Sequence, residues 1–296
     1  MTTLARRLII LALGLLAGIC VWPLVETVLY FQGSFSSYRT FLPLLGAVTG
    51  AVMGAFFGAA EGITSRVKSR LANGMLLGAA VGLAGGALGF LAGQAVLWLT
   101  GNLILRSYRD FQFVVLPVSR AVGWAVLGVF VGAVEGVRAG SPKRILVGVL
   151  GGLVGGLLGG LVLEYSRLVL PRIAWSRLAG LVVLGLAIAL FYGLIERGMS
   201  FGVLRVLTGP LKGKEFLVNQ GRMRIGRSRR NEIALADYGD LADVQARIRV
   251  RRGDVVISNA EPRVPLLVNE QRAQEKTLRL GDVVKLGSAR FYYRHE

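Results

Sequence analysis

The chain has 296 residues, of which 53% are hydrophobic, and its mean hydropathy of +0.58 is too high for an ordinary soluble domain. Lys and Arg outnumber Asp and Glu by 35 to 17, which gives a formal net charge of +18. The one histidine, His295, and the one cysteine, Cys20, exclude a Ser-His-Asp triad, a Cys-His dyad, a zinc-binding HExxH helix and an intramolecular disulfide. We therefore expect a membrane protein that is not an enzyme and has no metal or cofactor.

The composition changes near residue 200 and predicts two domains. Residues 1–198 hold the long apolar runs and most of the glycine, whereas residues 204–296 have the composition of a soluble domain. A helix needs about 20 apolar residues to cross a bilayer, and it satisfies its own backbone polar groups there. We predict an all-α membrane domain over 1–198, a linker over 199–203 and a soluble domain over 204–296. Six transmembrane helices are expected at about 8–31, 41–63, 75–99, 114–137, 145–164 and 178–195.

The charges between the spans predict the orientation. Arg6 and Arg7 precede a first span that is long and lacks a small-x-small cleavage site, so we expect an uncleaved signal anchor. Basic residues are more frequent in the loops on the side of the N-terminus, which favours cytoplasmic N- and C-termini in an inner or plasma membrane. The residues on that side are Arg6, Arg7, Arg66, Lys68, Arg70, Arg138, Lys143 and Arg144, against Arg39, Arg106, Arg109, Arg167 and Arg172 on the other.

An internal repeat runs through the apolar part. Residues 54–62 (GAFFGAAEG) and 128–136 (GVFVGAVEG) match at an offset of 74, and the glycines of the following spans match at the same offset. A weaker third copy covers 177–193, where the spacing of an arginine and three glycines echoes 120–136. The pattern predicts three tandem helical hairpins in the same orientation.

Glycines recur every four residues within the repeat and line one face of each helix. Such a glycine zipper lets another backbone approach closely. Tight packing within the chain is the simpler interpretation, and formation of a homo-oligomer or a sliding interface in a transporter is the alternative. The central glycines of the two better copies are Gly50, Gly54, Gly58, Gly78, Gly82, Gly128, Gly132, Gly152 and Gly156.

Two glutamates occupy equivalent positions in the repeat, Glu61 and Glu135. An ionisable residue within a span is costly to bury and therefore a candidate for transport of a cation or of protons. Both lie near the end of their span, with Arg66 and Arg138 following about a turn later, so local pairing or snorkelling to water explains them equally well.

The soluble segment predicts an antiparallel β-sandwich. Short alternating runs are separated by turn residues such as Gly209-Pro210, Gly253-Asp254 and Gly281-Asp282. We expect strands at about 203–207, 215–218, 222–225, 246–250, 254–257, 265–268 and 290–293.

The motifs of this segment resemble the forkhead-associated (FHA) family, which implies a β-sandwich whose loops read phosphothreonine on partner proteins. The resemblance covers essentially all of residues 204–296. It is carried by a glycine hairpin at 209–213, then 225–228 (IGRS), 231–235 (NEIAL), 245–248 (QARI), 268–269 (VN) and 280–287 (LGDVVKLG).

The binding residues of the family are only partly present. Its phosphate-binding arginine falls on Arg227, which Ser228 follows, and a guanidinium suits phosphate oxygens. Its Ser-x-x-His motif falls on 242–245 (ADVQ), so the phosphate-contacting serine is missing, Gln245 replaces the histidine, and Asp243 lies beside the expected phosphate. The asparagine expected near 264–265 is also absent. The residues predicted to contact a partner, phosphorylated or not, are Arg227, Ser228, Arg229, Arg230, Asp243, Gln245 and Asn269.

These features predict a bacterial-type membrane protein whose cytoplasmic FHA-like domain binds a cytoplasmic protein, phosphorylated or not, as a scaffold in signalling or assembly. A transporter or channel that uses Glu61 and Glu135, with the FHA-like domain as its regulator, is the alternative. A basic face could also bind anionic lipid headgroups, whereas nucleic acid is not expected because aromatic residues are not interleaved with the arginines. That face would comprise Arg222, Arg224, Arg229, Arg230, Arg247, Arg249, Arg251 and Arg252.

Overall fold

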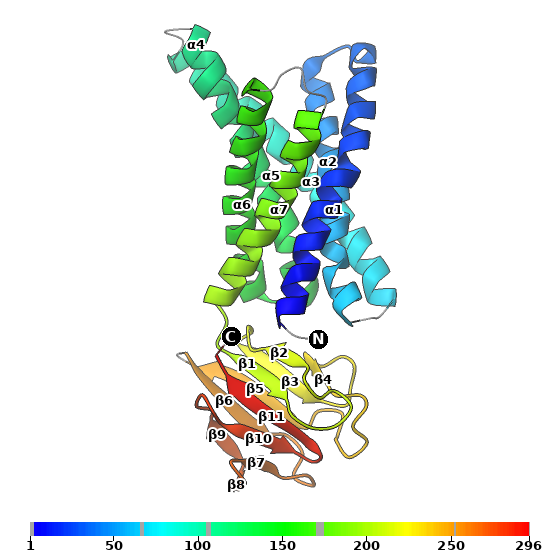
Figure 1. The fold of residues 1–296 in the computed structure, drawn as a ribbon, viewed down its shortest axis with the longest axis vertical. Coiled ribbons are helices and arrows are strands. Elements are labelled where there is room, and N and C mark those ends of the chain that lie inside the picture. The colour runs from blue at the N-terminus through cyan, green and yellow to red at the C-terminus, as the bar shows by residue number, and fades with distance from the viewer. Residues whose placement is uncertain (1–2, 66–67, 105–107, 170–174, 252, 296) are drawn as a thin grey trace. The chain divides into compact units, whose positions relative to one another are not determined.

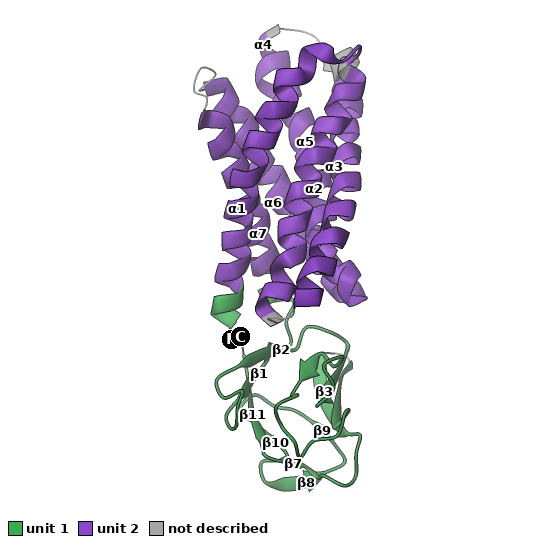
Figure 2. Ribbon diagram, turned by 90° about the vertical axis from the view of Figure 1, so that its right-hand side faces the viewer, with its two compact units in different colours: residues 1–6, 197–296 green, residues 7–196 purple. Residues whose placement is uncertain are grey.

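The computed structural model describes residues 3–65, 68–104, 108–169, 175–251 and 253–295. The chain divides into two compact units, one of residues 7–196 and the other of residues 197–296 with the first six residues (Figure 2). The first unit is a bundle of long helices, and the second contains all of the described strands (Figure 1).

Six helices of the described chain are long and apolar enough to cross a membrane, which confirms the prediction. They are α1 (Thr3–Tyr30), α2 (Tyr38–Ser65), α3 (Lys68–Ile104), α5 (Leu116–Ala139), α6 (Pro142–Val169) and α7 (Trp175–Gly198). Helix α3 is 37 residues long and extends beyond the predicted span at both ends. Its first turn is polar, so hydropathy alone gave no signal there. The short α4 (Tyr108–Asp110) and a π-helical turn (Phe111–Val115) lead into α5.

Helices α2 and α3 pack with their backbones in contact. A Cβ atom added to Gly50 would overlap the carbonyl oxygen of Gly82, and one added to Gly54 would overlap that of Gly78. No side chain larger than hydrogen fits along this seam. Between membrane helices, where the hydrophobic effect provides no attraction, such close approach stabilises the pair through van der Waals contact.

Helices α5 and α6 repeat this seam 74 residues later in the sequence. A Cβ atom on Gly128 would overlap the carbonyl oxygen of Gly152, and one on Gly132 would overlap that of Gly148. The sequence repeat is thus a repeat of one structural unit, a helix pair joined along its glycines.

The third copy of the repeat is completed by a helix from the other end of the apolar region. Gly185 of α7 meets the backbone of Gly14 of α1. A Cβ atom on Gly18 of α1 would lie 2.6 Å from the carbonyl oxygen of Leu181, just as one on Gly156 of α6 would lie 2.5 Å from that of Trp124. The prediction of three tandem hairpins is therefore wrong for the third copy, whose two helices are the first and the last of the unit.

The β-domain consists of two sheets, mostly antiparallel as expected. One has the order β2 (Glu215–Leu217), β1 (Val203–Val206), β11 (Ala289–Arg294), β10 (Val283–Leu286), β7 (Leu266–Val268), β8 (Gln271–Ala273). The other has the order β4 (Ile233–Ala234), β3 (Arg222–Gly226), β5 (Ala246–Arg251), β6 (Asp254–Asn259), β9 (Glu275–Thr277). The short β4 pairs parallel to β3. Strands β4, β8, β9 and β10 were not predicted from the sequence.

The β-domain has its own hydrophobic core between the two sheets. Alternate residues of the strands point inward, and Ile225, Ile257 and Phe291 are fully buried there. All of the core residues lie between Leu204 and Tyr293, and Phe201 packs against them. A fragment of residues 199–296 therefore carries a complete core and is expected to fold on its own.

Candidate functional site

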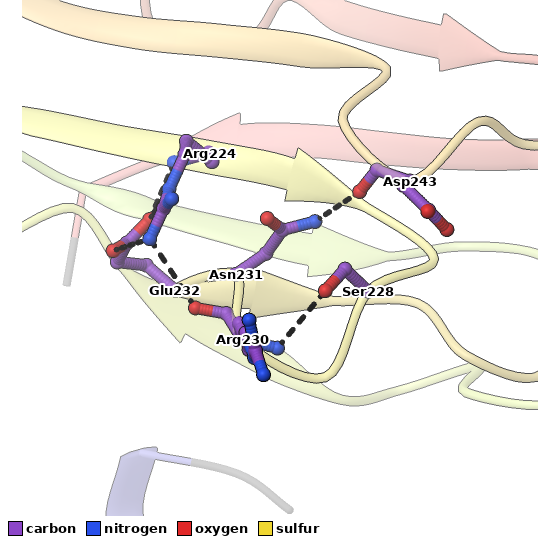
Figure 3. A network of polar contacts seen from close by, with 6 residues as sticks. All are labelled: Arg224, Ser228, Arg230, Asn231, Glu232 and Asp243. Carbon is purple, nitrogen blue, oxygen red and sulfur yellow. Dashed lines mark hydrogen bonds and ion pairs between the residues drawn. The ribbon is translucent and has the colours of Figure 1, made fainter.

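Three loops of the β-domain surround the position at which the FHA resemblance places the ligand: residues 227–232, 235–245 and 260–265. Gly226 is required at the end of β3, because a Cβ atom there would lie 2.5 Å from the carbonyl oxygen of Asp243. The backbone N–H of Arg227 donates to Ala242 O at 2.9 Å, and that of Ser228 donates to Asp243 O at 3.2 Å. The side-chain amide of Asn231 donates to the same carbonyl oxygen at 2.6 Å (Figure 3). These bonds hold the first two loops together.

Arg227 and Asp243 face one another across these loops. Arg227 Nε lies 3.6 Å from Asp243 Oδ1, and the two side chains are 53% and 76% exposed. An ion pair this exposed contributes little to stability. It nevertheless places a carboxylate beside Arg227, which the FHA resemblance predicts to bind phosphate, and a carboxylate repels an approaching phosphate.

Gln245, one of the predicted partner-binding residues, is fully buried and holds the loops together. Its Nε2 donates to Asn259 Oδ1, Glu261 O and Val264 O at 3.0–3.2 Å, and its Oε1 accepts from the N–H of Ala242. The amide thereby ties the second loop to the third, in the place where the family has its histidine.

Asn269 also lies away from the predicted site. It is in the turn between β7 and β8, in the other sheet, with a positive φ of 54° that asparagine tolerates better than most residues. Its Nδ2 donates to Asp282 Oδ1 at 2.8 Å, and its Oδ1 accepts from the N–H of Val283 at 2.9 Å. The asparagine thereby shapes the hairpin between β7 and β8.

A polar network that the sequence did not reveal surrounds the first loop (Figure 3). Glu232 accepts hydrogen bonds from the backbone N–H of Arg224 at 2.7 Å and from the Arg224 guanidinium at 3.2–3.3 Å. The same guanidinium donates to the backbone carbonyl oxygen of Arg230, and the backbone N–H of Arg230 donates to Ser228 Oγ. Burial opposes ionisation of Glu232, but the hydrogen bonds from Arg224 outweigh it and hold the pKa of the carboxyl below its usual range.

The lowered pKa of Glu232 predicts an acid-sensitive contribution to stability. Because the unfolded chain binds a proton at higher pH than the folded domain, the contribution is complete above the ordinary pKa of 4.5 and is lost as the pH falls through the lower folded pKa. At pH 7, Glu232→Gln should reduce the free energy of unfolding of residues 199–296 by about 1 kcal/mol. Urea denaturation should show this difference shrinking below about pH 4.5. The exposed Glu275→Gln is the control, and a constant difference for Glu232→Gln would contradict the prediction.

An arginine-rich face covers part of the five-stranded sheet. Arg222 lies opposite Arg249, and Arg224 lies opposite Arg247, in adjacent antiparallel strands. All four are exposed, as is Arg251. Like charges directly opposite one another destabilise a sheet, and Glu232 offsets this only at Arg224. Arg229 and Arg230 lie in the neighbouring loop, and Arg252, which was predicted to join the face, lies outside the described residues.

The paired glutamates of the membrane unit contact residues from other helices. Glu61 of α2 pairs with Arg70 of α3 at 3.2 Å and also with Arg138 of α5. The buried Glu135 accepts a hydrogen bond from the hydroxyl of Tyr192 of α7. Arg138, which follows Glu135 in the sequence, contacts Glu61, the equivalent glutamate of the other copy. These contacts fit a role in packing. Arg66, Arg106 and Arg172 of the orientation argument lie outside the described residues.

The geometry of the β-domain is that of an FHA-like interaction module. Residues 205–296 match the family model for the cytoplasmic domain of an inner membrane component of T3SS. Similar solved structures include the FHA domain of an Arabidopsis thaliana hypothetical protein, with 28% identity over 32% of this chain and 85% of that one and a TM-score of 0.30. An FHA domain from Chlamydia trachomatis has 23% identity over 32% and 97% of the two chains, also with a TM-score of 0.30. No curated protein matches the chain.

Proposed function

We propose that this protein is a membrane scaffold. In this proposal the six helices hold the FHA-like domain at the cytoplasmic face of an inner or plasma membrane, with both chain termini on that side. There the domain binds a protein partner in a signalling or assembly complex. The basic loops next to the N-terminus and the match of residues 205–296 to a family of cytoplasmic domains support this orientation.

The partner need not be phosphorylated. The observation that carries this part of the proposal is the Asp243 carboxylate, 3.6 Å from the Arg227 guanidinium. Phosphate recognition needs several convergent donors, and the serine expected at position 242 is an alanine. Gln245 still fixes the loops, so the surface keeps a defined shape for a partner.

Peptide binding by residues 199–296 tests the proposal. The fragment is titrated calorimetrically against a degenerate phosphothreonine peptide library and its unphosphorylated counterpart. We expect affinities for the two libraries that agree within about threefold, because Asp243 offsets the attraction of Arg227 for phosphate. The variant Ala242→Ser/Asp243→Asn removes the repulsion and supplies a hydroxyl, so it should prefer the phosphorylated library by about tenfold.

Two arginine variants complete this experiment. Arg227→Ala should abolish the new phosphate preference of the double variant, whereas Arg222→Ala, the same change on the exposed sheet face, should leave it intact. If the unchanged fragment itself binds phosphorylated peptides more tightly and loses that preference in Arg227→Ala, the domain is a phosphate reader and the phosphate-independent proposal is wrong.

A further inference from the structure

A cavity of about 220 Å³ lies inside the helical unit and is lined by residues from all six long helices. It is near the end of the bundle where α1, α3 and α6 end and α2, α5 and α7 begin. Much of its wall is apolar. Leu45, Phe90, Leu97, Leu116 and Leu181 belong to it.

Three arginines reach this cavity, Arg120, Arg167 and Arg177. Arg120 donates to Glu164 Oε2 at 3.1 Å, and Arg167 lies 3.6 Å from Glu164 Oε1. The Glu164 side chain is only 5% exposed, and its Oε1 also accepts from the indole N–H of Trp124 at 3.0 Å. A carboxylate this buried, with three donors around it, is a built polar site and not a surface ion pair.

The second half of the site comes from another copy of the repeat. Arg177 Nε lies 2.8 Å from Glu26 Oε1, close enough for an ion pair, although the N–H is not aligned for a hydrogen bond. Arg177 follows Arg120 by 57 residues, which is also the offset between the glycines of α5 and those of α7. By the same comparison of glycines, Glu26 in α1 is equivalent to Glu164 in α6. Two copies of the repeat therefore place the same Arg–Glu pair at the same level of the bundle.

The site is rich in positively charged groups and in hydrogen-bond donors. Among the described residues, three guanidiniums lie here against the two carboxylates Glu164 and Glu26. The arginine side chains remain 35–39% exposed, so a ligand can reach them. The side-chain nitrogen of Gln94, which also lines the cavity, is buried and has no hydrogen-bond partner among the described residues. Buried donors are normally satisfied, so the site is suited to an anion.

We propose that this cavity binds an anionic phospholipid, with its phosphate between Arg120 and Arg177 and part of an acyl chain against the apolar wall. Guanidinium groups match phosphate oxygens in geometry and charge. The apolar lining, inside a unit of membrane-spanning helices, favours a ligand that carries a hydrocarbon chain over a free anion. The proposal does not depend on the function of the FHA-like domain.

Native mass spectrometry of the full-length protein in detergent tests the proposal. The protein is titrated with phosphatidylglycerol, with phosphatidylcholine of the same acyl chains, and with inorganic phosphate. We expect phosphatidylglycerol to bind at least about tenfold more tightly than phosphatidylcholine, and Arg120→Gln/Arg177→Gln to abolish that preference. Arg39→Gln/Arg109→Gln is the matched control. Both of its arginines are exposed, lie at the same end of the bundle and do not line the cavity, so the preference should persist.

A third variant separates ligand binding from packing. Glu164→Gln keeps an acceptor for Trp124 and raises the positive charge of the site, so the affinity for phosphatidylglycerol should be maintained or increased. If Glu164→Gln lowers that affinity as much as the double arginine variant does, the arginines act through packing and the proposal is wrong. Equal affinity for the two lipids would also overturn it. Displacement of phosphatidylglycerol by millimolar inorganic phosphate would assign the site to free phosphate and overturn the lipid proposal.

Discussion

Replacing Gly54 by alanine should lower the melting temperature of the full-length protein by about 10 °C, although alanine is the better helix former. The new Cβ atom would overlap the carbonyl oxygen of Gly78. Because that oxygen belongs to the backbone of α3, it cannot move away as a side chain could. Helices α2 and α3 must then move apart by on the order of 1 Å along the whole seam, with loss of many favourable contacts. Thermal unfolding in detergent, followed by circular dichroism, measures the effect.

Gly193→Ala is the matched control for this prediction. Gly193 is also in a membrane helix, α7, but an added Cβ atom there meets nothing within 4 Å. Without a clash, the higher helix propensity of alanine should leave the melting temperature unchanged or raise it slightly. Gly128→Ala, at the equivalent position of the α5–α6 seam, should repeat the loss seen for Gly54→Ala. Equal melting temperatures for Gly54→Ala and Gly193→Ala would show that the close approach is not needed for stability.

Gln245→Met should reduce the free energy of unfolding of residues 199–296 by about 3 kcal/mol. Methionine has nearly the same length, so the change removes the amide without opening a large cavity. It leaves the carbonyl oxygen of Glu261 and the N–H of Ala242 without the partner that Gln245 provides, whereas Val264 O keeps the bond from Asn259 Nδ2 at 3.1 Å. Buried groups that lose their partner cost about 1–3 kcal/mol each. Urea denaturation monitored by circular dichroism measures this free energy of unfolding.

Gln271→Met provides the control for Gln245→Met. Gln271 lies on β8 and is exposed, so its replacement should change the free energy of unfolding by no more than about 0.5 kcal/mol. If Gln245→Met is equally mild, the loops are held by their other hydrogen bonds, such as those from Arg227 and Asn231 to the second loop. The role assigned to Gln245 would then be wrong.

Local patterns in the sequence were sufficient to predict both domain types. Each membrane helix contains a long, predominantly apolar run, which is a property of about 20 consecutive residues and needs no knowledge of the fold. The FHA-like domain was predicted from short motifs whose residues have local structural roles. Gly226 of the IGRS motif is an example, since only glycine allows the second loop to approach β3 so closely.

Predictions for individual side chains were less reliable, because polar residues were assigned to neighbours in sequence or to ligands. Gln245 and Asn269 were expected at a partner-binding surface, yet each completes hydrogen bonds with loops or strands distant in sequence. Local pairing of Glu135 with Arg138 was one of two interpretations, and the structure brings Arg138 to Glu61 of another helix. Glu164 received no role, although it is among the most buried acids of the described chain.

The sequence by itself determined the six membrane helices, most of the longer strands, and which face of each membrane helix carries the glycines. Only the tertiary structure decided which glycine faces meet. It paired α1 with α7, the two helices of the unit that are farthest apart in the sequence. The physical reason is that the glycine faces of equivalent helices are chemically alike, so pairing depends on how the whole bundle closes. The same closure brings Arg120, Arg177, Glu164 and Glu26 to one level of the bundle and so creates a charged cavity that no single segment encodes.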